Sequence, residues 1–293
     1  MKRYVMPFFI ILFVGCLSQG EREIDGYPIK VIDGLSREVL IEELPERIVS
    51  TSPSNTEILF SLDLGERVVG VTTYCNYPEE VKSKEKIGGF SDLDLEKIVS
   101  LEPDLVLMSG GVQEKYVEKL EQLGLVLVVL KPENLDEILE NIILVGKITG
   151  KDVEAERLKA SMEERIKKVE ERASRSEKKK VFYIVWGDPL MTAGKDTFTG
   201  ELIEKAGGLN IFDDIKGYKE IDLELVIERN PEIIITSTHS GIDFDALRRD
   251  KRFKSIDAII NNRLYIIDAD LVSRPGPRIV QALELFLLWI TGG

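Results

Sequence analysis

Several residue types on which common protein functions depend are scarce in this chain. Its 293 residues include one histidine and two cysteines, and 52 acidic residues outnumber 39 basic ones, which gives a formal net charge of −13. No run rich in lysine and arginine offers a footprint for phosphate backbones, so nucleic-acid binding is not expected. The sequence also shows no cluster of metal ligands. Asp92, Asp94 and Glu96 look like a fragment of a calcium-binding loop, but the glycine of such a loop is missing, and Asp94 is better explained as a helix N-cap.

The sequence motifs of common enzymes are absent as well. The chain contains no G-x-S-x-G nucleophile elbow, no G-x-x-x-x-G-K-[ST] phosphate loop and no G-x-G-x-x-G after a predicted strand. The single histidine, His239, lies beside serines in STHSG, and nothing in the sequence marks an acid that would orient it. We therefore expect a protein without catalytic activity or a cofactor. A His239-dependent hydrolase or metallohydrolase is the alternative from a different class, which metal analysis of the purified protein would separate.

The most hydrophobic stretch, at the N-terminus, is short. Residues 1–16 read MKRYVMPFFIILFVGC, and the apolar part from Val5 to Gly15 falls below the ~20 residues needed to span a bilayer but has the length of a signal-peptide core. Its end resembles a lipoprotein cleavage site at which Cys16 receives the lipid. The sequence thus predicts an exported protein, anchored to the membrane at the cell surface or in the periplasm, with an uncleaved anchor as the alternative. Lipidation would leave Cys75 as the only free thiol, without a disulfide partner.

Beyond this segment, predicted strands alternate with predicted helices in two separate blocks. The strands are expected at 47–51, 67–72, 104–109 and 125–130, and again at 181–186, 232–237 and 263–268. Such alternation indicates parallel β-α-β units. Helical periodicity from Asn134 to about Arg175 separates the blocks, as one long helix or two stacked ones. Ser54-Asn55-Thr56-Glu57 has the pattern of a capping box and is predicted to begin the first helix.

The predicted fold class is α/β, with two α/β lobes on parallel-type sheets, joined by a long rigid helix and with a ligand cleft between them. The expected division is a lipoprotein signal at 1–16, a tether and β-hairpin at 17–44, an N-terminal lobe at 45–131, a bridging helix at 132–178 and a C-terminal lobe at 179–293.

One helix–turn–strand segment occurs twice. Residues 92–111 read DLDLEKIVSLEPDLVLMSGG and residues 220–239 read EIDLELVIERNPEIIITSTH, with Asp-Leu-Glu and a proline-acid step repeated at an offset of 128 residues. The repeat indicates internal duplication and places Glu96 and Glu224 at equivalent positions in a first helical turn. The helix dipole favours such a glutamate by ~0.3–1 kcal/mol, so either one alone would mean little. Two at matching positions indicate a shared function.

Ligand contacts are expected in the loops that follow the strands, because ligands bind beyond the carboxyl ends of strands in open α/β sheets. These loops are rich in aromatic residues and glycine, and they are Ser52–Asn55, Tyr74–Tyr77, Ser109–Gly111, Trp186–Asp188, Thr238–Gly241 and Asp270–Arg274. Facing lobes would bring these loops together around a shared cleft.

Several stretches, taken in order and spacing, are typical of one family. They include ERIVSTSPSNTEILF from Glu46, IGGFSDLDLEKIVSLEPDLVL from Ile87, PLMTAGKDTFTGELIEKAGGLNIF from Pro189 and SRPGPRI from Ser273. Together they resemble the substrate-binding proteins of cobalamin and ferric-siderophore ABC importers, and they are most similar to the cobalamin-binding members. The resemblance runs from about Arg47 to the C-terminus.

The resemblance implies a shallow ligand cleft between the lobes and assigns eight positions to it. These positions are Pro53, Ser54, Tyr74, Phe90, Trp186, Tyr218, Asp270 and Arg274. Phe90 and Tyr218 stand where the cobalamin-binding members have tryptophan, and packing in the core is the alternative for Phe90. His239 is a ninth candidate, since its loop is the second-lobe counterpart of Ser109-Gly110. It either reaches a bound cobalt, for which neutral imidazole is a good ligand, or packs beside the corrin edge.

The resemblance also implies that Glu96 and Glu224 dock onto arginines of the permease. A permease of two identical subunits presents the same cationic patch twice, and internal duplication supplies two equivalent acidic residues. We therefore predict a lipid-anchored protein that captures cobalamin or another corrinoid for an ABC permease homodimer and its ATPase. A ferric siderophore or haem is the alternative ligand, favoured if basic residues cluster in the cleft; Arg274 is the clear candidate for such a residue.

Overall fold

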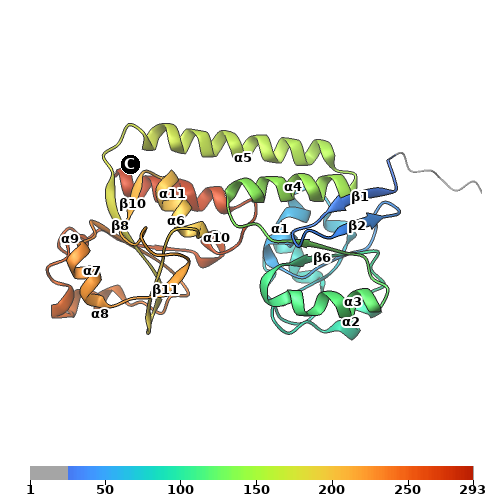
Figure 1. Cartoon of the computed structure of the whole chain (residues 1–293), viewed down its shortest axis with the longest axis horizontal. Coiled ribbons are helices and arrows are strands. Elements are labelled where there is room, and N and C mark those ends of the chain that lie inside the picture. Colours follow the sequence, from blue (N-terminus) through green and yellow to red (C-terminus); the bar gives the residue numbers. More distant parts are fainter. Residues whose placement is uncertain (1–25, 293) are drawn as a thin grey trace, which may run out of the picture.

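The computed structural model describes residues 26–292 and shows two lobes side by side, spanned along one side by a long helix (Figure 1). Cys16 and the predicted lipoprotein signal at 1–16 lie outside the described residues. Over the described range, no helix combines the length and the apolar character that crossing a membrane requires.

The first lobe is built on a five-stranded parallel sheet with the order β5-β4-β3-β6-β7. Its strands are β3 (Ile48–Ser50), β4 (Val68–Val71), β5 (Glu85–Lys86), β6 (Leu105–Ser109) and β7 (Leu127–Leu130). Two buried cores lie on its two faces. Leu105 and Leu107 of β6 belong to one core, and the alternating Val106 and Met108 belong to the other. The strands are apolar on both faces because helices cover both.

Helices from each side of the sheet complete these cores. The helical elements are α1 (Pro53–Ser61), α2 (Leu95–Ser100), α3 (Val117–Gln122), α4 (Leu135–Thr149) and the 3₁₀ turns η1 (Gly65–Arg67), η2 (Glu79–Ser83) and η3 (Gly111–Tyr116). Helices α1 and α4 cover one face and α2 and α3 the other (Figure 1). An antiparallel hairpin, β1 (Ile29–Ile32) and β2 (Glu38–Ile41), joins β7 through the hydrogen bond from the Gly34 amide to the Val129 carbonyl, at 2.7 Å.

The second lobe contains a six-stranded sheet with the order β11-β9-β8-β12-β13, in which β10 also pairs with β8. Its strands are β8 (Lys179–Gly187), β9 (Leu190–Ala193), β10 (Gly208–Asn210), β11 (Tyr218–Glu220), β12 (Ile233–Ser237) and β13 (Leu264–Ile267). Strands β8, β10, β12 and β13 are parallel, whereas β9 and β11 are antiparallel to their neighbours. The sequence patterns do not mark β9 and β11, because each strand is only three or four residues long and the residues of β11 are all exposed.

Helices again cover both faces of the second sheet. They are α6 (Phe198–Lys205), α7 (Leu223–Arg229), α8 (Phe244–Arg249), η4 (Lys251–Phe253), α9 (Asp257–Ile260), α10 (Ala269–Val272) and α11 (Ile279–Thr291). Tyr183 and Ile235 pack with α6 and α11, and Phe182 and Ile234 pack on the other face with α7, α8 and α9.

The helical stretch between the lobes is two helices rather than one. Helix α4 ends at Gly150, which takes the left-handed φ of 67°, and α5 (Asp152–Ala173) then runs back along it. A Cβ at Gly146 would lie 2.4 Å from the Cβ of Ala155, so this glycine permits the close approach of the two helices. Helix α5 is about 33 Å long at 1.5 Å per residue and reaches from the first lobe to the second (Figure 1).

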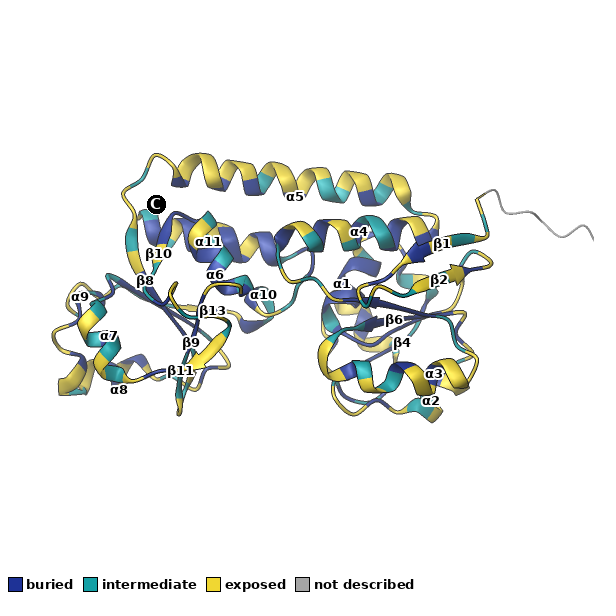
Figure 2. Ribbon diagram, viewed as in Figure 1, coloured by how far each residue is buried: buried dark blue, intermediate teal, exposed yellow. Residues whose placement is uncertain are grey.

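One side of this bridging helix is fixed by packing. Figure 2 shows α5 exposed along its outer side, with buried positions on the side that faces α4 and α11. These positions are Ala155, Met162, Ile166, Val169 and Ala173. The same core continues into α11, whose Leu283, Phe286 and Ile290 are fully buried. The bridge is therefore part of one continuous core that includes elements of both lobes.

Candidate functional site

The carboxyl ends of strands from both lobes meet at one cavity of about 440 Å³. In a parallel sheet these ends share one edge, so loops from several strands converge there. Six of the eight positions that the resemblance assigns to the cleft line this cavity, which we call the interlobe cavity: Pro53, Ser54, Tyr74, Phe90, Asp270 and Arg274. The remaining lining is four serines and a proline, so Asp270 and Arg274 are the charged residues of the wall.

Two aromatic side chains form the apolar part of the interlobe cavity. Tyr74, which follows β4, is 61% exposed. Phe90 is half-buried and belongs to none of the three buried cores of the described residues, so it is available to a ligand rather than to core packing. The Gln113 amide donates to the carbonyl oxygens of Phe90 (2.9 Å) and Thr51 (2.7 Å), which ties the Phe90 loop to the end of β3.

The predicted capping box at the start of α1 is wrong. The N-cap is Ser52, whose hydroxyl accepts from the Asn55 amide at 3.3 Å, and Pro53 takes the first helical position, where its missing N–H costs nothing. Ser54 therefore lies inside the helix, with its hydroxyl 3.1 Å from that of Ser52. The shift frees Glu57 from a capping role.

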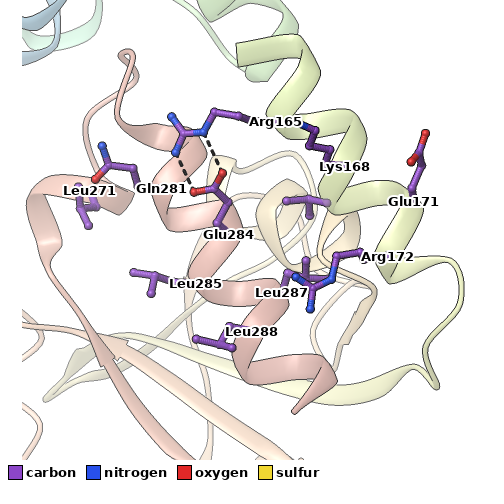
Figure 3. A pocket seen from close by; sticks show the side chains of 11 residues that line it. Arg165, Lys168, Glu171, Arg172, Leu271, Gln281, Glu284, Leu285, Leu287 and Leu288 are labelled. Carbon is purple, nitrogen blue, oxygen red and sulfur yellow. Dashed lines mark hydrogen bonds and ion pairs between the residues drawn. The ribbon is translucent and has the colours of Figure 1, made fainter. Parts of the chain in front are cut away.

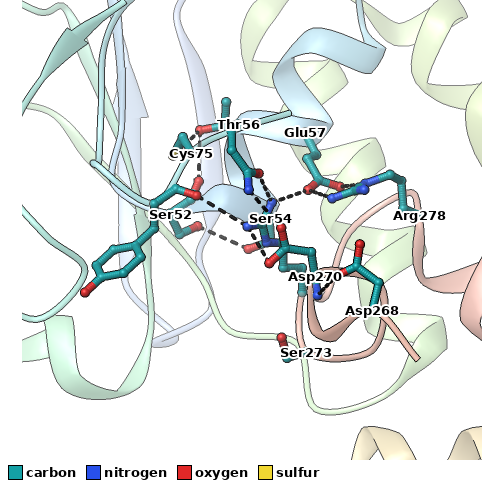
Figure 4. A network of polar contacts seen from close by, with 12 residues as sticks. Ser52, Ser54, Thr56, Glu57, Cys75, Asp268, Asp270, Ser273 and Arg278 are labelled. Carbon is teal, nitrogen blue, oxygen red and sulfur yellow. Dashed lines mark hydrogen bonds and ion pairs between the residues drawn. The ribbon is translucent and has the colours of Figure 1, made fainter. Parts of the chain in front are cut away.

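Glu57 instead anchors a buried network of ion pairs that joins the two lobes behind the interlobe cavity (Figure 4). It is 2% exposed and accepts from Arg274 at 3.0 Å and from Arg278 at 2.6 and 2.8 Å. Arg274 also pairs with Asp270 at 2.7 Å and donates to the side-chain oxygen of Asn76 at 2.8 Å. Hydrogen bonding to Glu57 raises the pKa of Arg278, so this arginine stays charged.

Asn76 belongs to the predicted loop Tyr74–Tyr77, but Glu57 and Arg278, which complete this network, are not among the site residues that the sequence predicts. The partners of Glu57 lie 217 and 221 positions along the chain, so no local pattern marks the pairing. One feature of the sequence does indicate that an acidic partner is needed. Arg274 and Arg278 are four residues apart, just before the apolar run of the last predicted helix, and two neighbouring cations beside a predicted core helix require an acid from elsewhere.

Trp186 lines a separate cavity of about 680 Å³ in the second lobe. It is 46% exposed at the end of β8, and its indole N–H donates to the Asp188 carbonyl at 2.8 Å, which fixes the ring. Leu190 and Leu223 are among the apolar residues beside it. Because β12 lies between β8 and β13, Trp186 stands two strand spacings, about 10 Å, from the strand that leads to Asp270.

Two other predicted ligand residues line neither cavity. His239 is exposed in the loop after β12, between the strand of Trp186 and the strand that leads to Asp270, and no hydrogen bond to its imidazole occurs within residues 26–292. Tyr218 is 48% exposed in the edge strand β11, opposite Ala193 of β9.

The duplicated glutamates occupy equivalent places in the two lobes. Glu96 lies in the first turn of α2 and Glu224 in the first turn of α7, and both are exposed. Asp94 caps α2 by accepting from the Lys97 amide at 2.9 Å, whereas Asp222 makes no such bond. Both helices lie on the side of the molecule opposite the bridging helix, near its two ends (Figure 1).

A hollow of about 770 Å³ between α5 and α11 lies away from the strand ends (Figure 3). Leu285 and Leu288 are among its lining residues, and Arg165 of α5 pairs with Glu284 of α11 through two bonds of 2.8 and 2.7 Å. Of the loops predicted from the sequence, Asp270–Arg274 reaches it through Leu271. The Arg165–Glu284 pair fastens the bridging helix to the second lobe.

Within residues 26–292, no three His, Cys, Asp or Glu side chains are grouped so that they could hold a metal ion. Cys75 is buried, with its sulfur 3.2 Å from the hydroxyls of both Thr56 and Thr72. It is therefore a packed side chain within the network of Figure 4.

Comparisons with known proteins agree with this architecture. Residues 48–271 match the family described as periplasmic binding protein. An uncharacterized ABC transporter substrate-binding lipoprotein of Bacillus subtilis, YvrC, is 35% identical over 275 residues, which are 91% of this chain and 87% of the relative.

Two solved structures illustrate the range of similar proteins. The periplasmic vitamin B12-binding protein BtuF of Vibrio cholerae superposes with a TM-score of 0.74 at 27% identity, over 84% of this chain and 96% of that one. The periplasmic heme-binding protein RhuT of Roseiflexus gives a TM-score of 0.75 at 30% identity, over 84% and 98%.

Proposed function

Because the chain belongs to the periplasmic binding protein family, which supplies substrate-binding proteins to ABC importers, we propose that it captures cobalamin or another corrinoid in its interlobe cavity and delivers it to an ABC permease. The family consists of extracytoplasmic transport proteins rather than enzymes. The likeness to a vitamin B12-binding protein supports a corrinoid, and the likeness to a heme-binding protein supports haem as the alternative.

The observation that carries the corrinoid proposal is the chemistry of the cavity wall. A corrin is a broad ring with apolar faces and a rim of amide groups, so it requires apolar surfaces with a few hydrogen-bonding groups around them. Tyr74, Phe90 and Pro53 provide the first, and the serines and Asp270 provide the second. Arg274 is the one cation of the wall, which is too few for the carboxylates or catecholates of anionic iron chelates.

We assign the opposite side of the ligand to the second lobe. Trp186 lies at the end of β8, and His239 and Asp270 follow the neighbouring strands β12 and β13, so the three stand in a row along one edge of the sheet. A ligand that rests on Phe90 and extends along this row would contact residues of both lobes. Tyr218 is proposed as a further contact from the edge strand β11.

The proposal is tested by mixing the purified protein with cyanocobalamin, desalting, and recording the visible spectrum. We expect the corrinoid absorption to elute with the protein at near one-to-one stoichiometry. A colourless protein after desalting, together with retained haem or ferric siderophore in the parallel sample, would favour the alternative ligand.

Trp186 is expected to report on binding through its fluorescence. Corrinoids absorb in the near ultraviolet and should quench Trp186, whereas Trp289 is half-buried and stacked on Tyr265 at 4.9 Å, away from both cavities. Titration of the unmodified chain should show strong quenching, and Trp186→Phe should lose most of it. Equal quenching in the two proteins would mean that the Trp186 loop does not contact the ligand.

His239 is expected to modify the cobalt spectrum only if its imidazole coordinates the metal. The spectrum of aquocobalamin bound to the unmodified chain is compared with that of His239→Ala. A shift between the two would support coordination, since neutral imidazole is a good cobalt ligand. Identical spectra would restrict His239 to packing beside the ring.

Ligand binding is expected to close the lobes only slightly. Helix α5 spans both lobes and resists bending, because bending must distort its hydrogen-bond ladder. The contacts of Glu57 with Arg274 and Arg278 hold the lobes together at a second place. Small-angle scattering curves with and without corrinoid should therefore nearly superimpose, and a large compaction on binding would refute a rigid bridge.

Delivery requires contacts with the membrane and with the importer. We propose that Glu96 and Glu224 dock onto matching cationic patches of a permease homodimer, which works with an ATPase. We also propose that lipidated Cys16 anchors the chain to the membrane at the cell surface or in the periplasm, as the lipoprotein name of the Bacillus relative supports. The His239-dependent hydrolase lacks a motivating observation, because His239 is exposed without an orienting acid in the described part of the chain.

A further inference from the structure

Arg274 lines the interlobe cavity, but both terminal nitrogens of its guanidinium group are engaged by the protein. One terminal nitrogen donates to Glu57 (3.0 Å) and Asn76 (2.8 Å), and the other contacts Asp270 (2.7 Å) and the Tyr74 carbonyl (3.3 Å). Its side chain is 10% exposed. An arginine held in this way offers a ligand little of its charge.

The charges that form these ion pairs balance. Arg274 and Arg278 contribute two positive charges, and Glu57 and Asp270 contribute two negative ones. Arg278 is held by both oxygens of Glu57 and lies over the ring of Tyr77, at 4.1 Å from its centroid. The two carboxylates thus hold both guanidinium groups in ion pairs within the protein. Glu57 does not line the cavity, so it holds Arg274 from behind the cavity wall.

We propose that Glu57 and Asp270 determine the charge specificity of the cleft: by holding and neutralising Arg274, they make the cavity accept an uncharged ligand and disfavour a polyanionic chelate. Glu57 acts through Arg274 and is a positioning residue. This inference rests on the proposed function, because it assumes that ligand binds in the interlobe cavity.

The reason is electrostatic. A polyanion that enters the cavity meets the carboxylate of Asp270, and it can bind Arg274 only by breaking contacts that the protein already makes. Removing one acid leaves one unbalanced positive charge in the ion-pair network, which favours an anion. Glu57 does not line the cavity, so Glu57→Gln leaves the contacts of an uncharged ligand in place, and the ratio of the two affinities then reports on the charge of the network. Asp270 lines the cavity, so for Asp270→Asn the affinity for the chelate is also compared on its own.

The test compares cyanocobalamin, which is uncharged, with trianionic iron(III)–enterobactin, binding to the purified full-length chain. Glu57→Gln and Asp270→Asn each remove one negative charge at the network. Glu284→Gln makes the same change of net charge on α11, in the hollow away from the strand ends, and is the matched control. Asp270→Asn keeps Arg274 paired with Glu57, so it remains informative if Glu57→Gln does not fold.

Both network variants should shift the affinity ratio towards the chelate by at least about tenfold, as close charge pairs at binding sites do. The shift should shrink in high salt, and Glu284→Gln should not show it. An unchanged ratio in the folded network variants, or an equal shift in Glu284→Gln, would overturn the inference. If the unmodified chain binds no corrinoid, the proposed ligand is wrong, whereas a higher chelate affinity in Glu57→Gln than in Glu284→Gln would still support charge control by Glu57.

Discussion

A chain carrying both Glu96→Arg and Glu224→Arg is expected to bind corrinoid as the unmodified chain does and to deliver none of it to the importer. Both carboxylates are exposed in first helical turns, outside the interlobe cavity and the cavity beside Trp186, so the proposed ligand contacts should survive. At a desolvated docking interface, close charge pairs couple by ~1.5–7 kcal/mol, and reversal adds repulsion between like charges. Each single reversal should impair uptake, because a docked lobe would tilt, and the double change should abolish it.

Uptake is measured in vesicles that contain the reconstituted importer, alongside corrinoid binding to each isolated variant. Glu156→Arg with Glu163→Arg is the matched control, because both residues are exposed on α5, on the opposite side of the molecule from α2 and α7. This control changes the net charge equally and should leave uptake intact. Normal uptake by the Glu96/Glu224 variant would mean that the two glutamates do not dock onto the permease and only stabilise the first turns of their helices.

Replacing Glu57 with alanine should destabilise the protein by about 3–5 kcal/mol, the usual cost of removing one partner from a buried ion pair. Arg278 would lose both of its bonds to a carboxylate, and Arg274 would retain only Asp270 as an ionic partner. Unfolding in urea, followed by circular dichroism, measures the change in the free energy of unfolding.

Glu284→Ala is the control for this loss of stability. Glu284 also holds an arginine through two bonds, but its side chain is 44% exposed and that of Arg165 is 34% exposed. Solvent screens such a pair, so its loss should cost only about 0–1 kcal/mol. Similar losses in Glu57→Ala and Glu284→Ala would contradict the view that the buried network holds the lobes together.

Much of the architecture can be predicted from local patterns. Runs such as Leu105–Met108, buried on both faces, and the helical periods between them indicate a parallel sheet covered on both sides. The break at Gly150 could not be chosen over one continuous helix, because a glycine inside a helical pattern is compatible with either. Strand β11 could not be predicted, because its three residues are all exposed and show no alternation of apolar and polar side chains.

In the candidate site, too, some features can be predicted from local sequence and others cannot. Residues that directly follow strands, such as Tyr74 and Asp270, can be located from sequence because strand ends converge. The pairing of Glu57 with Arg274 and Arg278 depends on how the two lobes meet, and it could not be read from local sequence. The correct N-cap, Ser52, was within reach, because Pro53 suits the first helical position and thereby points to the residue before it.

The central claim, capture of a corrinoid by the interlobe cavity, is tested most directly by calorimetry of the purified chain against cyanocobalamin, haem and a ferric siderophore under one set of conditions. The account predicts one-to-one binding of the corrinoid, with weaker binding of both iron compounds, and a marked loss of corrinoid affinity in Phe90→Ala. No heat with any corrinoid, together with clear saturable binding of haem or the ferric siderophore, would contradict it.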